Sequence, residues 1–353
     1  MEENKNVNSQ EEKIFVDNKE EVTNAPKQGV FNPNQFYFPA PITSKDDTLK
    51  EINAARSIFK GQVENANKTK KILLLSFVGL FLIFAMLLII DPEIINKLFT
   101  PLVVVFIVFL AIVYLINNST KKKKNVFMDE YRYHYFLNID SYCYYLKGFS
   151  NVELSYNSKI DLEEVKKISC YENITSCPTR DVVKGKIFGV DFTSFDALIK
   201  TKIEMEGKQL DKIVFSGKIF ELDLKVKKAG KMFIYLKGCG DSYPTDLRNT
   251  NEVDIKDLKR EYKVYSSFEN SSSILTKSAV EALNKFEINE YIEDIIISIT
   301  SEGIYFGLSL TTKYMTIPYQ EDVDESYLNN YKKALEQISV FVAGLASSKS
   351  YNK

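Results

Sequence analysis

The sequence predicts an α+β fold in which a two-helix transmembrane hairpin precedes a soluble domain with a mostly antiparallel sheet flanked by helices. Three observations support this prediction. Two uncharged apolar runs stand close together, at residues 72–90 and 101–116. Several short segments after residue 180 alternate polar and apolar residues with a period of two, which is typical of strands. Segments with helical spacing come before and after these strands, an order that is typical of α+β domains.

Residues 1–43 form an acidic and polar tail that is rich in Glu, Asn, Lys and Pro. Because such a segment buries too little apolar surface to offset the entropy of folding, we expect it to be disordered. The tail contains an aromatic patch, Phe31, Phe36, Tyr37 and Phe38, which is a docking segment, is incidental or lies loosely on the membrane.

Residues 44–71 are predicted to form an amphipathic helix next to the first apolar run. Ser44 or Asp46 is suited to cap its first turn. The apolar residues that recur at near-helical spacing are Leu49, Ile52, Ile58, Phe59 and Val63. This apolar face can pack on the folded domain, pair with a second copy or lie on a lipid surface, and packing on protein is the simplest of the three.

The two apolar runs within residues 72–116 are predicted to be transmembrane helices. A helix rises about 1.5 Å per residue, so roughly 20 apolar residues cross a bilayer core of about 30 Å. Lysines flank the outer ends of both runs, whereas the connecting loop carries only Lys97. Positively charged flanks stay on the cytoplasmic side, so we expect an inner-membrane protein with two spans and both termini in the cytoplasm. A buried helical hairpin in a soluble core is the alternative.

A run of four lysines, Lys121, Lys122, Lys123 and Lys124, follows the second apolar run. As a topology anchor this run needs no further partner. As an anionic-lipid contact it would gain about 1 kcal/mol per lysine near a membrane surface. The anchor is the simpler interpretation, and the lipid contact is compatible with it.

Residues 125–347 are predicted to form the cytoplasmic α+β domain, followed by a flexible tail at 348–353. Helices are expected at 127–146, 161–167, 273–286 and 325–347, and strands at 186–192, 212–224, 231–237, 261–265, 293–300 and 304–310. A bend is expected at Gly217, with 231–237 as the hairpin partner of that strand. The last two strands are joined by a Ser-Glu-Gly sequence, which is a strong hairpin signal.

The residues that carry chemistry do not form a recognisable catalytic set. The chain has one histidine, His134, and four cysteines without a closely spaced pair, so no metal site is predicted. Gly238-Cys239-Gly240 is interpreted as a tight turn rather than a nucleotide-binding loop. The carboxylates that we considered are scattered over strands and loops: Glu163, Glu164, Asp181, Asp191, Asp196, Asp241 and Asp246. We therefore predict no catalytic residue and no cofactor, and a net charge of −1 does not favour nucleic acid as a partner.

Short motifs in the second half of the chain follow one another in a characteristic order. They are a Gly-x-Ile strand at 185–187, a Phe-x-Gly-x-Ile strand at 215–219, and a Tyr-x-Val-Tyr strand at 262–265 followed by Leu-Thr at 275–276. This order resembles the bacterial membrane protein family called domain of unknown function 3137, over roughly residues 44–347. Tyr262 stands where that family's strand often has Phe. The resemblance implies a bacterial inner-membrane protein with a cytoplasmic domain, no assigned reaction, and a membrane-protein partner of the LemA type.

These observations favour a membrane-anchored interaction or scaffold module that is not an enzyme and binds a protein or lipid partner near the inner leaflet. The expected partners are the lipid bilayer and a membrane protein, and homo-oligomerisation is left open. One alternative is an uncharacterised enzyme whose site is assembled by folding around His134 or Cys239. Another is an oligomeric pore subunit, against which the uncharged apolar runs count, because intramembrane charges usually mark ion pathways.

Overall fold

The structure is a computed structural model that describes most of the chain after residue 43. The described residues are 44–90, 94–156, 158–168, 171, 173–205, 208–236, 247, 249–311, 319–323 and 325–352; the side chains at 80, 84–85, 87–90, 94–103, 105, 167–168 and 205 are not included. The predicted tail at 1–43 lies outside the described residues, as do Cys170, Cys239, Asp241 and Asp246.

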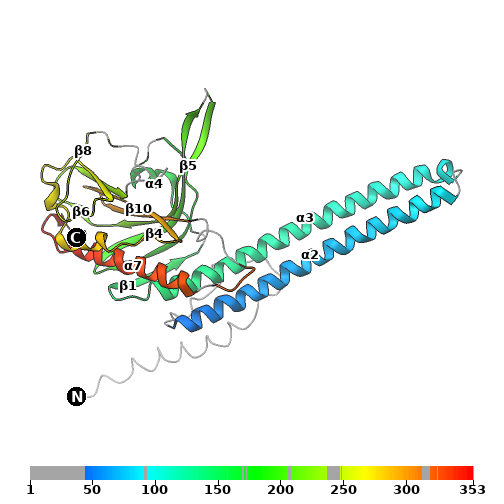
Figure 1. Ribbon diagram of the computed structural model, residues 1–353, viewed down its shortest axis with the longest axis horizontal. Coiled ribbons are helices and arrows are strands. Elements are labelled where there is room, and N and C mark those ends of the chain that lie inside the picture. The colour runs from blue at the N-terminus through cyan, green and yellow to red at the C-terminus, as the bar shows by residue number, and fades with distance from the viewer. Residues whose placement is uncertain are drawn as a thin grey trace, which may run out of the picture. The chain divides into compact units, whose positions relative to one another are not determined.

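Within these residues, the centre of the fold is a ten-stranded antiparallel sheet (Figure 1). Its strands are β1 (Phe149–Ser155), β2 (Ile174–Ser176), β3 (Thr179–Ile187), β4 (Val190–Met205), β5 (Lys208–Leu222), β7 (Lys231–Leu236), β8 (Asn251–Glu252), β9 (Tyr262–Ser266), β10 (Ile292–Thr300) and β11 (Ile304–Leu310). The order across the sheet is β1-β3-β4-β5-β11-β10-β7-β9-β8, and β2 pairs with β4. A second, two-stranded sheet joins β6 (Lys225–Val226) to β12 (Tyr351–Asn352).

Two long helices form a hairpin that projects away from the sheet (Figure 1). The helices of the fold are α2 (Lys45–Ile90), α3 (Ile94–Cys143), α4 (Leu162–Ile168), α5 (Lys277–Asn284) and α7 (Glu325–Ala346), with a short 3-10 helix, η3, at Ser271–Ser273. The α2 helix begins at the predicted cap, where the Ser44 hydroxyl accepts a hydrogen bond from the Asp47 backbone N–H at 3.4 Å. Near the sheet, the Phe59 ring of α2 stacks on Tyr131 of α3 with centroids 5.2 Å apart.

The sheet has an apolar core on each face because successive side chains of a strand point to opposite sides. On one face, Phe192, Phe220 and Phe306 belong to the larger core, which also contains buried residues of α2, α3, α5 and α7. On the other face, Phe195 and Phe215 belong to a smaller core with Val165 of α4. The folded end of the hairpin is therefore part of the larger core.

The predicted transmembrane hairpin is wrong. The helices have 46 and 50 residues, and the apolar runs are parts of them that continue directly into charged stretches such as Lys68–Lys71 and Lys121–Lys124. Among the residues that the structure describes, neither these helices nor any other has a stretch sufficiently long and apolar to cross a membrane. The predicted inner-membrane location, with two spans and both termini cytoplasmic, is wrong for the same reason. The antiparallel sheet and its flanking helices agree with the structure.

Three local predictions about strands also need correction. The segment predicted as one strand at 186–192 is a hairpin, because the chain turns at Phe188 and Gly189, whose φ angles are 48° and 83°. The 231–237 segment contains β7, which pairs with β9 and β10 rather than with β5. The predicted bend at Gly217 is a point of close approach, because a Cβ there would collide with the backbone carbonyl of Leu308 on β11.

Candidate functional site at the base of the hairpin

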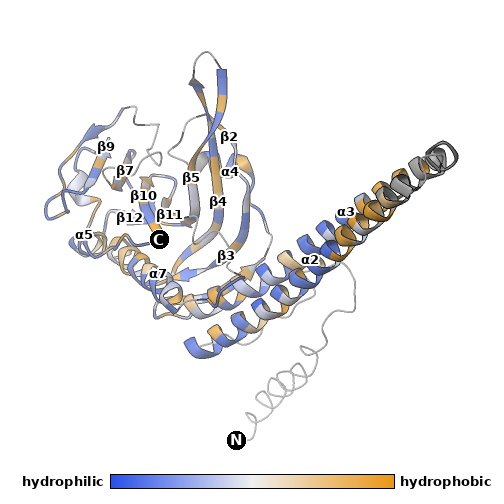
Figure 2. Ribbon diagram, turned by 45° about the vertical axis from the view of Figure 1, so that its right-hand side comes forward, coloured by the Kyte–Doolittle hydropathy of each residue, from blue (hydrophilic) through white to orange (hydrophobic). Residues whose placement is uncertain are grey.

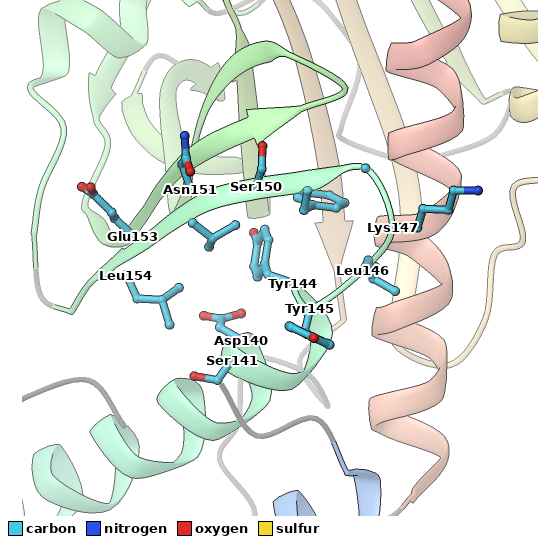
Figure 3. A pocket seen from close by; sticks show the side chains of 13 residues that line it. Asp140, Ser141, Tyr144, Tyr145, Leu146, Lys147, Ser150, Asn151, Glu153 and Leu154 are labelled. Carbon is cyan, nitrogen blue, oxygen red and sulfur yellow. The ribbon is translucent and has the colours of Figure 1, made fainter. Parts of the chain in front are cut away.

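A groove of about 970 Å³ lies where the end of α3 turns into β1 (Figure 3). The described residues that line it form one short stretch of chain, from Asp140 in the last turn of α3 to Leu154 on β1. The chain reverses at Gly148, where φ is 101° and a Cβ would collide with the ring of Phe188. Glycine is required at this turn because L side chains rarely adopt that backbone conformation.

The floor of the groove is buried and the rim is exposed. Figure 3 shows Asp140 and Ser141 on the end of α3, and Tyr144 between that helix and β1. Tyr144 and Ser194 of β4 share a buried hydrogen bond of 2.8 Å between their hydroxyl oxygens, which holds the floor to the sheet. The exposed side chains of the rim are Tyr145, Lys147, Ser150, Asn151 and Glu153.

Beneath this floor lies a group of charged side chains that we call the base cluster: Arg132, Asp140, Arg180, Asp181, Asp196 and Lys218. At its centre is the fully buried Lys218, whose Nζ lies 3.3 Å from Asp196 Oδ1 and 4.0 Å from Asp140 Oδ1. The Tyr331 hydroxyl of α7 donates a hydrogen bond of 3.1 Å to the same Asp140 oxygen. Asp140 of α3 therefore contacts both the sheet and α7.

The rest of the base cluster surrounds Asp181, in the irregular part of β3. Arg132 of α3 donates a hydrogen bond of 3.1 Å from its guanidinium to Asp181 Oδ2. The Nε of Arg180 lies 3.7 Å from Asp181 Oδ2 and 3.7 Å from Asp196 Oδ2. Three acidic and three basic side chains thus balance one another, and both Arg132 and Asp140 connect α3 to the sheet.

Strand register explains why these residues meet. Arg180 of β3 is directly opposite Asp196 of β4, and Asp196 is directly opposite Lys218 of β5. Residues opposite each other on neighbouring strands have Cβ atoms about 5 Å apart, so opposite charges in such a row attract. The row lies on the face that carries Phe192 and Phe220, which is the face covered by α3 and α7.

Burial sets the protonation of Asp140. Loss of hydration raises the pKa of this carboxyl to about 6, although Lys218 and the Tyr331 hydrogen bond act in the opposite direction. Burial likewise raises the pKa of Tyr144 to about 12. A carboxyl with a pKa of about 6 changes charge in mildly acidic solution, whereas Tyr144 keeps its proton at neutral pH.

The structure places His134 outside the base cluster. It lies on α3, with its ring 5.4 Å from that of Tyr133, and burial lowers its pKa. Cys143 is buried and its thiol donates to the Leu328 carbonyl oxygen at 3.9 Å, and Cys177 is a half-buried free thiol. In the part of the chain that is described, no group of three or more His, Cys, Asp or Glu residues could hold a metal ion.

The predicted lipid-contact lysines, Lys121–Lys124, are exposed side chains on one continuous stretch of α3. They do not form a turn after the apolar run, because α3 continues to Cys143. Their contact with anionic lipid stays a prediction.

Sequence reasoning identified only part of the base cluster. Asp181 and Asp196 were among the scattered carboxylates, and the structure brings them together, while Glu163, Glu164 and Asp191 lie outside. Asp140 and Lys218 were missed. Their signal was a charged residue inside an apolar pattern: Asp140 interrupts an aromatic helix, and Lys218 interrupts an apolar strand.

Figure 2 shows that hydrophobic residues gather along the outer part of both helices of the hairpin, and many of their side chains are exposed. Those that are between 44% and 70% exposed are Ile72, Leu74, Leu75, Val78, Phe81, Leu82, Ile83 and Met86 of α2, and Val104, Phe106, Ile107, Val108, Leu110, Ile112, Tyr114 and Leu115 of α3. Between the helices, Phe77 stacks on Phe109 with ring centroids 4.4 Å apart. We call these exposed side chains the hairpin patch.

Comparisons with known proteins add little to this picture. No family model matches the chain, and no curated protein matches it. Among solved structures, it is similar to the crystal structure of the mycobacterial trehalose monomycolate transport factor A, with 14% sequence identity and a TM-score of 0.31 over 55% of this chain and 88% of that chain. A likeness this weak carries no argument about fold or function. The resemblance to the family of domain of unknown function 3137 therefore stays a prediction.

Proposed function

We propose that the chain is a non-enzymatic interaction module whose folded domain presents the helical hairpin to a partner protein. The observation that carries this proposal is the hairpin patch, with eight exposed apolar side chains on each helix. Contiguous apolar surface of this kind is rare on proteins that act alone, and it marks interaction sites. Full burial of one such side chain is worth about 1.5–3 kcal/mol, so covering only part of the patch suffices for stable binding.

The construction of the hairpin supports the same proposal. Its base is held by the stack of Phe59 on Tyr131 and by ion pairs of Lys45 with Glu325 and of Arg56 with Asp322. The base of the hairpin is therefore fixed to the folded domain, so less entropy is lost at that end when a partner binds. Apolar helices offered in this way fit a complementary helical surface, as in helix bundles and helix-in-groove complexes.

The proposal can be tested by photo-cross-linking with the full chain in its native cells. A photoreactive amino acid at Leu75 or Leu82 is compared with the same amino acid at Lys333, an exposed position on α7 of the folded domain. We expect a protein adduct of defined mass from the two hairpin positions only. An adduct of twice the chain's mass would identify the partner as a second copy.

The control removes the apolar character of the patch without touching the domain. Leu75→Gln combined with Leu82→Gln, with the photoreactive group at Val78, should abolish the adduct. The free energy of unfolding of the chain should stay the same as without these two substitutions. Labelling of lipid or detergent in place of protein, or equal labelling at Lys333, would overturn the proposal.

A further inference from the structure

We propose that Asp140 is a pH-sensitive joint between the hairpin and the folded domain, tight when its carboxyl is protonated and looser when it is ionised. Asp140 lies in the last turn of α3, the helix that runs from the hairpin into the larger core. It is buried, with contacts to Lys218 of β5 and Tyr331 of α7. A change in the charge of Asp140 therefore acts at the point where α3 contacts both the sheet and α7.

The arrangement of charges explains the direction. Lys218 is shared by two carboxylates, and Asp196 is the nearer at 3.3 Å against 4.0 Å for Asp140. When Asp140 is protonated, Lys218 and Asp196 form a balanced pair. When Asp140 is ionised, the base cluster holds equal numbers of acidic and basic groups, but Asp140 is the carboxylate farthest from a cation. Its nearest is Lys218 at 4.0 Å, whereas Asp196 has Lys218 at 3.3 Å and Arg180 at 3.7 Å. Burying a charge with such incomplete compensation is unfavourable.

The other groups around Asp140 do not supply the missing compensation. From α7, Tyr331 donates one hydrogen bond to the carboxylate, and Tyr144, beyond the helix end, is hydrogen-bonded to Ser194. From β3, Asp181 adds further negative charge, although Arg132 and Arg180 lie against it. Among the residues that the structure describes, the favourable contacts of ionised Asp140 are thus one hydrogen bond from Tyr331 and a lysine that it shares with Asp196.

Asp140 borders two spaces, through which proton exchange with solvent would take place. The carboxyl lines the groove, and it also lines a small cavity of about 20 Å³ beside Leu154 and Asp181. A space of this size holds about one water molecule. Loosening of the α3 end would move Asp140 and Ser141, and the floor of the groove would change with pH.

The proposal is tested by hydrogen exchange of the full chain from pH 5 to pH 8, after correction for the intrinsic pH dependence of exchange. Peptides covering the end of α3, about 132–146, should lose protection by at most roughly tenfold as pH rises from 5 to 8, with a midpoint near 6. Asp140→Asn should remove this dependence. Asp191→Asn, which changes an exposed carboxylate paired with Lys186, should leave it unchanged.

Two further variants test the cause. Tyr331→Phe and Lys218→Met each remove a group that favours the ionised form, so each should move the midpoint to higher pH. If Lys218→Met does not fold, Tyr331→Phe alone decides. An unchanged pH profile in Asp140→Asn, or an unchanged midpoint in Tyr331→Phe, would overturn the proposal.

Discussion

The Tyr331 hydroxyl donates a hydrogen bond of 3.1 Å to Asp140, and this buried contact joins α7 to the end of α3 across 191 positions of sequence. The same carboxyl faces Lys218, so one acidic side chain touches a helix and a strand at once. Substitutions of single residues in this arrangement should therefore either raise or lower the stability of the protein, depending on which residue is changed.

Neutralising Asp140 should stabilise the protein at neutral pH. The folded pKa of about 6 lies above the reference value of 3.8, so ionised Asp140 opposes folding, and wild-type stability falls as pH rises between these values. Asp140→Asn has no charge to bury, so its free energy of unfolding does not fall in this way. The difference in unfolding free energy between the variant and wild type should therefore increase by about 1 kcal/mol between pH 5 and pH 7.5. Urea denaturation at both pH values measures the difference. A variant that is equally destabilised at both would show that the carboxyl is needed for other reasons.

Removing Lys218 should have the opposite effect. Lys218→Met leaves Asp196 without its nearest cation, and breaking one side of a buried pair costs about 3–5 kcal/mol. The matched control is Lys186→Met, because Lys186 pairs with the exposed Asp191. The free energy of unfolding of this variant should differ from that of wild type by no more than about 1 kcal/mol. Equal losses of unfolding free energy in the two variants would contradict the role given to Lys218.

Gly217 should not tolerate a methyl group. In Gly217→Ala the new Cβ would collide with the backbone carbonyl of Leu308, and neither strand can move without losing its pairing. We expect a loss of about 3 kcal/mol in thermal or urea unfolding. Gly61→Ala is the control, because that helical position has nothing within 4 Å and should gain about 0.5–1 kcal/mol. Similar stabilities of the two variants would show that the backbone at Gly217 does not lie close to the carbonyl group of Leu308.

The hydrogen bond between Tyr144 and Ser194 should show coupling in a double-mutant cycle. Tyr144→Phe or Ser194→Ala alone leaves a buried hydroxyl without this partner, at a cost of about 1–3 kcal/mol. The double variant should cost less than the sum of the two single changes. Strict additivity in the measured free energies of unfolding would mean that the bond contributes nothing.

Local patterns in the sequence predicted part of this fold well. The hairpin of β10 and β11 follows from alternating apolar residues and a Ser-Glu-Gly turn, all close in sequence. The hairpin of β3 and β4 was missed because Phe188 has a positive φ, which a phenylalanine rarely adopts and which no turn signature marked. The transmembrane prediction relied on two apolar runs alone, and in the described part of the chain no helix is long and apolar enough to cross a membrane.

The base cluster could not be predicted from spacing. Asp140, Asp196 and Lys218 come from α3, β4 and β5, and they meet only because of sheet register and the way in which α3 crosses the sheet. Lys218 inside an apolar strand was the available clue, since a charge in such a position needs a partner. The identity of that partner depends on tertiary structure.

Because α3 is one continuous helix of 50 residues, a change in its direction at one end would be carried to the other. Its length is about 75 Å, so a tilt of about 5° around the end near Asp140 displaces the opposite end by roughly 6 Å. By this geometry, a small rearrangement of the buried side chains around Asp140 would produce a much larger displacement at the far end of the hairpin. Conversely, a displacement of the far end would bear on the residues of the groove floor.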